Sequence, residues 1–291
     1  MLLNQKMKEM HLPHAEAGVV QYLLAQGSAV RGLSTRRIAS ECYTTPPTLV
    51  RLGQRLGFEG WADFIDAFLD EQDYVERHFQ QIDANRPFSP GSSPATIANK
   101  IATLQQESIQ DTIALLDYHM LQKAVNCLLR TRNVYLVGVS ISLDCTYQFK
   151  HQMQRLGKNV ILEANQGELL CTLMAATPDD CAIVVSYSGT TQRIVDAMRI
   201  LYEEGVPIIL LTGLGQNPII EKAECVLHMT TRERLYSKIG NFTTEVSTHL
   251  LLDILYSCYF AADYEKNWDR RIRTAHQAEL YRLSDNEIMM E

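Results

Sequence analysis

The second half of the chain alternates between short apolar runs and helical patterns, and this alternation constrains the fold more than any other feature. The runs occupy residues 133–139, 159–162, 181–186, 206–212 and 225–229. They are short, continuous and rich in β-branched residues, as expected of strands that are buried on both faces. Helical patterns lie between them, near 142–157, 165–176 and 190–204, with a short turn at 217–222. Such alternation predicts an α/β fold with a five-stranded parallel sheet and right-handed crossover helices.

The first part of the chain has a helical rhythm throughout. Between residues 13 and 75, apolar residues recur at spacings of three and four in several short pieces. The segment "RPFSPGSSP" at 86–94 concentrates Pro, Ser and Gly and cannot continue a helix. A helical stretch follows at roughly 95–130, and a long amphipathic helix near 242–264 precedes a polar tail. We predict an all-α domain at 1–80, a linker at 81–95 and the α/β domain at 96–291.

The segment "LSTRRIASECYTTPPTLVRLGQRLGF" has the pattern of a helix-turn-helix. Ser34 or Thr35 can cap a first helix, and "ECYT" supplies a short turn. Thr45 can cap a second helix that Pro46 begins, because proline fits the first helical turn. The second helix is expected to turn three side chains outward (Thr48, Arg51, Arg55) and three leucines inward (Leu49, Leu52, Leu56).

The same segment is locally basic within an acidic chain of formal charge -7. Residues 31–57 contain five arginines and one acid, Glu41, a surplus of four positive charges. Arginines and hydroxyls at the start and exposed side of a second helix suit phosphate and base-edge contacts. The predicted DNA contacts are Thr35, Arg36, Arg37, Thr45, Thr48, Arg51 and Arg55. A helical protein-binding module with a solvated basic face is the alternative.

Two strand-to-helix turns in the second half are rich in hydroxyl groups. "SYSGTTQRI" follows the run at 181–186, and "GVSIS" follows the first run. Both turns fall at the carboxyl edge of the sheet, where ligands of α/β proteins bind. Gly189 permits close approach of the backbone, and the free amides of the next helix attract an anion. The sequence has neither GxxxxGK[ST] nor GxGxxG here, which favours a small phosphorylated metabolite over a nucleotide.

These motifs resemble known families. Residues 133–229 resemble the SIS (sugar isomerase) domain, in which "SYSGTT" matches a Ser-x-Ser-Gly-x-Thr phosphate loop. Residues 12–70 resemble the N-terminal helix-turn-helix of the RpiR family of bacterial regulators through "LSTRRIA", "TTPPTLVRLGQRLGF" and "GWADF". The resemblance implies a helical DNA-binding domain joined to a SIS-type five-stranded parallel sheet. It also implies control of transcription in carbohydrate metabolism by a phosphosugar.

The resemblance assigns roles to single residues. Ser142 matches the serine after the first SIS strand, and Ser186, Ser188 and Thr191 match the phosphate-binding hydroxyls, with Gly189 and Thr190 supplying backbone. Glu233 of "RERLY" could reach a sugar hydroxyl. Ser140 stands where the family usually has glycine, and Thr243-Thr244-Glu245 replaces a usual Ser-Ser-Arg. The predicted ligand-binding residues are Ser140, Ser142, Ser186, Ser188, Gly189, Thr190, Thr191 and Glu233.

Two rival functions stay open. A sugar-phosphate isomerase with a helical accessory domain would need a placed general base, and its candidates are Glu233, Glu245, His228 and His249. A helical interaction module with a vestigial SIS fold is the other. Because both histidines lie in packed patterns, we expect no catalytic residue and no enzyme activity.

Other expectations are negative or concern partners. The seven cysteines lack metal-ligand spacing, so we predict no metal and no cofactor. We find no secretory signal or membrane-spanning run, because Asp253 breaks the longest candidate, which predicts a cytoplasmic protein. The expected partners are operator DNA, a phosphorylated sugar and further copies of the chain, as a homodimer or homotetramer.

Overall fold

A computed structural model describes residues 12–78, 82–215 and 217–278, together with Leu3, Met7 and Met10. The chain divides into two compact units. The N-terminal unit comprises residues 1–107, 214–216 and 236–239, and the C-terminal unit comprises 108–213, 217–235 and 240–291. The boundary between the two units, at residues 107 and 108, falls within one long helix, α6 (Pro94–Ala114). The domain boundaries at residues 80 and 95 therefore stay a prediction.

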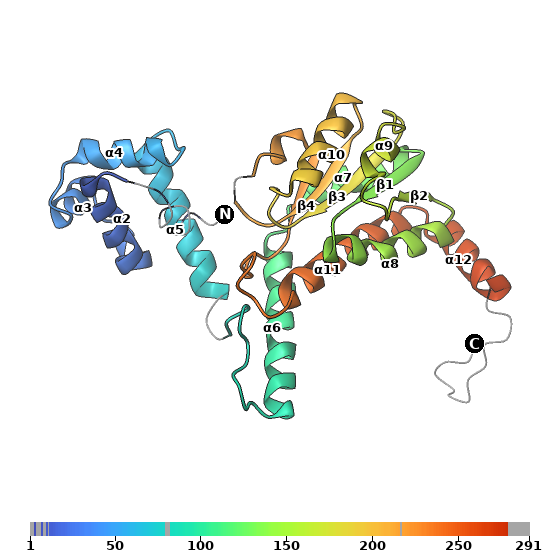
Figure 1. Ribbon diagram of the computed structural model, residues 1–291, viewed down its shortest axis with the longest axis horizontal. Coiled ribbons are helices and arrows are strands. Elements are labelled where there is room, and N and C mark those ends of the chain that lie inside the picture. The colour runs from blue at the N-terminus through green and yellow to red at the C-terminus, as the bar shows by residue number, and fades with distance from the viewer. Residues whose placement is uncertain are drawn as a thin grey trace. The chain divides into compact units, whose positions relative to one another are not determined.

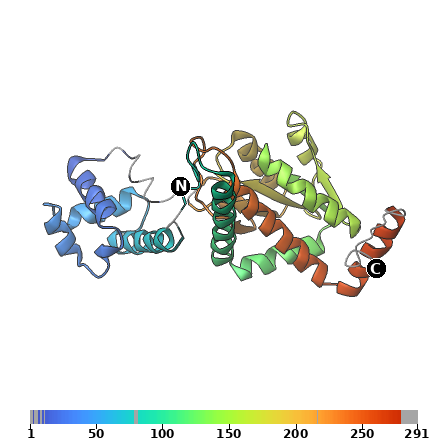
Figure 2. The same ribbon diagram turned by 90° about the horizontal axis from the view of Figure 1, so that it is seen from below.

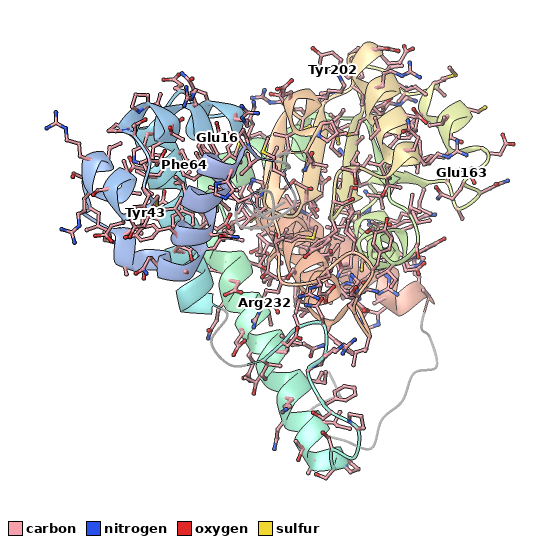
Figure 3. The ribbon with its side chains drawn as sticks, turned by 60° about the vertical axis from the view of Figure 1, so that its left-hand side comes forward. Glu16, Tyr43, Phe64, Glu163, Tyr202 and Arg232 are labelled. Atoms are coloured by element: carbon pink, nitrogen blue, oxygen red, sulfur yellow. The ribbon has the colours of Figure 1, made fainter. Side chains whose placement is uncertain are left out.

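The N-terminal unit is helical. Its elements are α2 (His14–Gln26), the 3-10 turn η1 (Gly27–Val30), α3 (Thr35–Glu41), α4 (Pro46–Arg55) and α5 (Trp61–His78). Phe64 lies at the centre of its core, with ring centroids 5.6 Å from Phe58 and 5.3 Å from Trp61 (Figure 3). Leu49, Leu52 and Leu56 are fully buried, as the periodicity of the second helix predicts.

The C-terminal unit contains the predicted parallel sheet. Its strands are β1 (Asn133–Val137), β2 (Asn159–Leu162), β3 (Cys181–Ser186), β4 (Ile208–Thr212) and β5 (Cys225–His228), in the order β2-β1-β3-β4-β5. Every paired neighbour runs parallel. The five apolar runs of the sequence therefore identify the strands correctly, and the α/β fold class is confirmed.

Helices cover both faces of this sheet (Figure 1). Alternate strand residues such as Leu136 and Ile183 pack against α7 (Tyr118–Arg130), α8 (Ile141–Arg155) and α11 (Phe242–Ala261). The intervening residues, such as Val137 and Val184, pack against α9 (Leu169–Leu173) and α10 (Gln192–Glu203). Figure 2 shows α8 and α11 in front of the strands. Continuous apolar runs are needed because each strand is buried on both faces.

Two helical features differ from the sequence prediction. The stretch at 95–130 is two helices, because Asp117 accepts hydrogen bonds from the amides of His119 and Met120 and so starts α7. The expected polar tail contains a helix, α12 (Tyr264–Ala278). Asn267 is its only buried residue, although Tyr264, Trp268 and Ile272 recur at a helical spacing of four that the sequence analysis did not use. Among the described residues, no helix combines the length and apolarity of a bilayer span.

Candidate functional site

The strand order creates a switch point between β1 and β3. From β1 the chain moves outward to β2, and it then returns to β3 on the other side of β1. The loops that follow β1 and β3 consequently leave the sheet in opposite directions, and ligands of open α/β sheets bind in the crevice between such loops. The two hydroxyl-rich turns, 138–142 and 186–191, flank this point. The topology therefore brings together the two segments that the sequence singled out.

The loop after β3 is shaped by its own hydroxyl groups. Ser186 is buried, and its Oγ accepts a hydrogen bond from the amide of Gly189 at 3.2 Å. The Oγ of Ser188 accepts one from the amide of Thr190 at 3.2 Å and lies 3.0 Å from Thr190 Oγ1. Ser188 is half-buried, whereas Thr190 and Thr191 are exposed. Ser186 thus fixes the turn, and Ser188, Thr190 and Thr191 are the hydroxyls that solvent or a ligand can reach.

Two helices begin at this edge without a side-chain cap. Thr191 precedes α10 and Ser140 precedes α8, and neither side chain bonds to an amide of its helix. The carbonyl of Thr191 accepts hydrogen bonds from the amides of Ile194 and Val195. The carbonyl of Ser140 accepts them from the amides of Leu143 and Asp144. In the part of the chain that the structure describes, the amides of Ile141, Ser142, Gln192 and Arg193 have no hydrogen-bond partner. Two positive helix ends are therefore available to an anion.

The turn after β1 requires an unusual backbone. Ser140 has a φ of 55°, in the left-handed region where glycine is favoured. This conformation accounts for the glycine that the RpiR resemblance leads one to expect at this position. Gly138 is needed for close packing, because a Cβ there would lie 2.8 Å from the amide nitrogen of Leu143. Gln166, which the sequence did not indicate, donates from Nε2 to the carbonyl of Gly138 at 3.4 Å.

The carboxylate of Glu233 bonds to the start of α11. It is buried, and its Oε1 accepts from the amide of Thr243 at 2.6 Å. Its Oε2 accepts from the hydroxyl of Thr244 at 2.7 Å, so the carboxylate caps the N-terminus of α11. The hydroxyl of Tyr187, in the loop after β3, donates to the carbonyl of Glu233 at 2.8 Å and accepts from its amide. Glu233 thereby connects the loop after β3 to α11.

The other candidate general bases lie on β5 and α11. His228 is half-buried at the end of β5, and burial lowers its pKa. Glu245 is exposed and His249 is half-buried on α11. Among the described residues, no cluster of three or more His, Cys, Asp or Glu side chains could hold a metal ion.

The lowered pKa of His228 predicts a pH dependence of stability. Burial disfavours the charged imidazolium in the folded chain, so the unfolded chain binds more protons as the pH falls below about 6.5. Stability should therefore decrease toward acid pH, and His228→Gln should remove this part of the decrease. Urea unfolding of both proteins at pH 7.5 and pH 5.5 measures the difference. An equal loss in the two proteins would show that His228 makes no such contribution.

In the N-terminal unit, the two predicted caps have different outcomes. Ser34 caps α3, since its Oγ accepts from the amide of Arg37 at 3.2 Å. Thr45 occupies the N-cap position of α4 but makes no side-chain capping bond, so this part of the prediction is wrong. Pro46 and the proline after it have no N–H, and the amide of Thr48 bonds to the carbonyl of Thr45. The Thr45 hydroxyl instead lies 3.3 Å from that of Thr48.

The outward face of α4 also differs from expectation. Thr48 is only 5% exposed, so its predicted outward placement is wrong. Its hydroxyl lies against that of Thr45 in the turn before α4, and its Oγ1 accepts a hydrogen bond from Arg51 Nη2 at 3.2 Å. Arg51 and Arg55 are exposed as predicted, but Arg55 Nε lies 2.9 Å from Glu16 of α2. Arg37 pairs with Glu41 at 2.8 Å, whereas Arg36 is exposed and Thr35 half-buried.

The exposed arginines therefore lie in the first turn of α3 (Arg36, Arg37) and in the second half of α4 (Arg51, Arg55). Thr48 orients Arg51, which the helical periodicity alone could not indicate. Tyr43, in the turn between α3 and α4, is 98% exposed and was not among the predicted contacts. The only sequence signal for it is an aromatic residue in a turn.

Comparisons with known families agree with this division of the chain. Residues 1–71 match the helix-turn-helix domain of the rpiR family, and residues 128–257 match the SIS domain. An uncharacterized HTH-type transcriptional regulator of Caldanaerobacter subterraneus subsp. tengcongensis is 25% identical over 244 residues, 83% of this chain and 84% of that protein. The HTH-type regulator YbbH of Bacillus subtilis is 24% identical over 261 residues, 90% of each chain.

Solved structures share the fold. The Vibrio vulnificus NanR protein, complexed with ManNAc-6P, covers 97% of this chain and all of its own, with a TM-score of 0.63 and 20% identity. The sugar isomerase domain of an RpiR transcription factor from Sphaerobacter thermophilus covers 62% of this chain and 98% of its own, with a TM-score of 0.56 and 22% identity. With its two matching domains in this order, and with regulators as its full-length relatives, the chain belongs to the RpiR family of helix-turn-helix transcriptional regulators.

Proposed function

We propose that this regulator binds operator DNA through α3 and α4, and that a phosphosugar bound between the loops after β1 and β3 controls its operator affinity. The observation that carries the proposal is the pair of uncapped helix N-termini at the switch point, with the hydroxyls of Ser142, Ser188, Thr190 and Thr191 beside them. Backbone amides and hydroxyls of this kind bind phosphate groups.

The kind of ligand follows from the chemistry of this edge. The loops supply amides and neutral hydroxyls, which suit one phosphate and a polyhydroxylated body. NanR, which shares the fold, was solved with ManNAc-6P, and this supports a phosphorylated sugar as the class of ligand. A role in carbohydrate metabolism follows from such an effector. The residues proposed to contact it are Ser140, Ser142, Ser186, Ser188, Gly189, Thr190 and Thr191, with Ser186 acting through the shape of the loop.

The site supports an isomerase activity less well than effector binding. Aldose–ketose conversion needs a general base at the sugar. Both carboxylate oxygens of Glu233, which the family resemblance implies could reach a sugar hydroxyl, already accept hydrogen bonds at the start of α11. We therefore assign Glu233 a positioning role through Tyr187 and propose that the protein is not an enzyme.

The DNA contacts centre on Arg36 and Arg51. Both are exposed, and the hydroxyl of Thr48 holds Arg51. A helix-turn-helix protein commonly binds two half-sites as a symmetric dimer, so the proposal includes a homodimer or homotetramer. Coupling between effector and operator of about 1–3 kcal/mol would change operator affinity roughly 5- to 150-fold.

A pair of substitutions tests whether the two functions are separate. Arg51→Ala should weaken operator binding about tenfold, because a guanidinium contact to DNA is lost, and it should leave phosphosugar affinity unchanged. Ser188→Ala should lower phosphosugar affinity about tenfold through the lost hydroxyl and leave operator affinity without effector unchanged. Fluorescence anisotropy with labelled operator and calorimetry with a phosphosugar measure the two affinities.

The control is Arg199→Ala, which removes an exposed arginine of α10 that pairs with Glu203 at 3.0 Å. It should change neither affinity. The effector is first found by a thermal-shift screen over phosphorylated sugars and amino sugars, since a ligand of the native state raises its melting temperature. If no member of the panel binds, or if Arg51→Ala and Ser188→Ala impair both functions equally, the proposal is wrong.

A further inference from the structure

The turn between α3 and α4 contains a residue in a strained backbone conformation. Tyr43 has a φ of 52°, and its amide donates to the carbonyl of Ser40 at 3.1 Å as α3 ends. Among the described residues other than glycine, only Tyr43 and Ser140 have a positive φ. A left-handed conformation is unfavourable for a bulky L-residue, because its Cβ approaches the following carbonyl oxygen. Strained backbone conformations cluster at functional sites, and Ser140 lies at the proposed effector site. The strain at Tyr43 therefore indicates a function for this residue too.

Folding does not account for a tyrosine at this position. Tyr43, which Figure 3 labels, is 98% exposed, so its ring and hydroxyl are almost entirely open to solvent. Glycine would adopt this backbone without strain, and asparagine would do so with less strain than tyrosine. Tyr43 therefore adds strain and buries nothing within the chain, and what it offers is a rigid ring with a hydroxyl donor at its end.

The position of Tyr43 relative to α4 indicates the partner. It precedes Thr45, the N-cap of α4, by two residues. In helix-turn-helix proteins the second helix enters the major groove by its N-terminal residues, and neighbouring groups contact the phosphates that border the groove. Arg36 on α3 and Arg51 on α4 supply positive charge on the two helices that the turn joins. Tyrosine hydroxyls are among the usual donors to DNA phosphates.

We infer that Tyr43 is a DNA contact whose hydroxyl donates a hydrogen bond to a backbone phosphate beside the groove that α4 enters. The inference rests on the proposed operator binding and adds a contact that does not depend on base sequence. It also explains why the strained tyrosine is compatible with function: the turn projects the ring away from the helical core and keeps its hydroxyl accessible.

The test compares Tyr43→Phe with Tyr43→Gly in the full-length chain. Tyr43→Phe should weaken binding about tenfold, both to the operator and to an unrelated duplex of equal length, since a hydrogen bond to a charged group is lost. The slope of log affinity against log salt should not change, because tyrosine carries no charge. Arg51→Ala, in contrast, should reduce that slope by about one.

Tyr43→Gly should weaken binding at least as much, and its melting temperature should equal or exceed that of the wild type because the strain is relieved. Tyr202→Phe is the matched control. It removes a hydroxyl from an exposed tyrosine of α10, which Figure 3 labels, and should change neither affinity nor slope.

Three results would overturn the inference: wild-type affinity in Tyr43→Phe, a loss confined to the operator, or a lower melting temperature in Tyr43→Phe. Wild-type affinity in Tyr43→Phe would mean that the hydroxyl does not contact DNA. A loss confined to the operator would mean that it contacts a base, and a lower melting temperature would mean that it stabilises the fold. If Arg51→Ala also leaves DNA binding intact, operator recognition by α4 fails as well. If Arg51→Ala weakens binding and Tyr43→Phe does not, only the inference about Tyr43 fails.

Discussion

Replacing Gly189 by valine should abolish the response to a phosphosugar, lowering effector affinity by roughly 100-fold or more. Gly189 has a φ of 66°, which valine adopts only with strain, and a Cβ there would lie 2.6 Å from Asn217 Oδ1. Asn217 cannot move aside freely, because it donates to Thr212 Oγ1 at 3.1 Å and accepts from the amide of Ile219 at 3.3 Å. The loop must therefore shift, and the loss of two charge-assisted hydrogen bonds to a phosphate accounts for the expected factor.

Gly205→Val provides a control with the same backbone strain. Gly205 has a φ of 70° and lies just beyond the other end of α10, where a Cβ would meet only Pro178 Cγ at 3.6 Å. Both variants should lose similar stability from backbone strain, but only Gly189→Val should lose effector binding. Calorimetry with the phosphosugar found in the screen, and operator binding with and without it, measure the outcome. Wild-type effector affinity in Gly189→Val would exclude the loop after β3 as the phosphate site.

The sheet could be predicted from the sequence because each strand carries its own signal. Residues such as Ile183 and Val184 pack on opposite faces, so a continuous apolar run is required whatever the neighbouring strands are. The strand order could not be read in this way. The pattern placed the turns after β1 and β3 at the same edge of the sheet, but only the strand order shows that β1 and β3 are neighbours and that the two turns flank one switch point. Ser34 was predictable as a cap because capping is local in sequence.

Failures occurred where distant or competing groups decide the outcome. The helical spacing of Thr48 suggested an exposed residue, but the turn that precedes α4 and the Arg51 side chain cover it. The bonds from the Glu233 carboxylate to Thr243 and Thr244 were also missing from the sequence analysis, because these partners lie ten and eleven positions later in the chain; its contact with a sugar stays a prediction. Tyr43 could not be identified from the sequence, because the pattern of apolar residues does not indicate a positive φ.

Buried charge is the least predictable feature of all, and it leads to the largest expected change in stability. Asp111 of α6 and Arg232, which follows β5, are 1% and 0% exposed at their side chains, with Oδ2 and Nη1 3.9 Å apart. The same Oδ2 accepts from the hydroxyl of Thr230 at 3.2 Å. Neither residue lies in a pattern that would indicate the pairing, since 121 positions separate them. Figure 3 marks Arg232 within the C-terminal unit.

Asp111→Ala should therefore lower the free energy of unfolding by about 3 kcal/mol, because it leaves a guanidinium buried without this carboxylate. The double variant Asp111→Ala with Arg232→Met should recover much of the loss, since the buried guanidinium that lost this carboxylate is then removed as well. Asp196→Ala, which removes an exposed carboxylate of α10 bonded to Gln192, should cost less than about 0.5 kcal/mol. Urea unfolding of the full chain measures all three as shifts of midpoint at constant slope. A double variant no more stable than Asp111→Ala would mean that Asp111 acts through packing and its bond to Thr230. A double variant more stable than Asp111→Ala would instead show that the loss comes from leaving the Arg232 guanidinium buried without the Asp111 carboxylate.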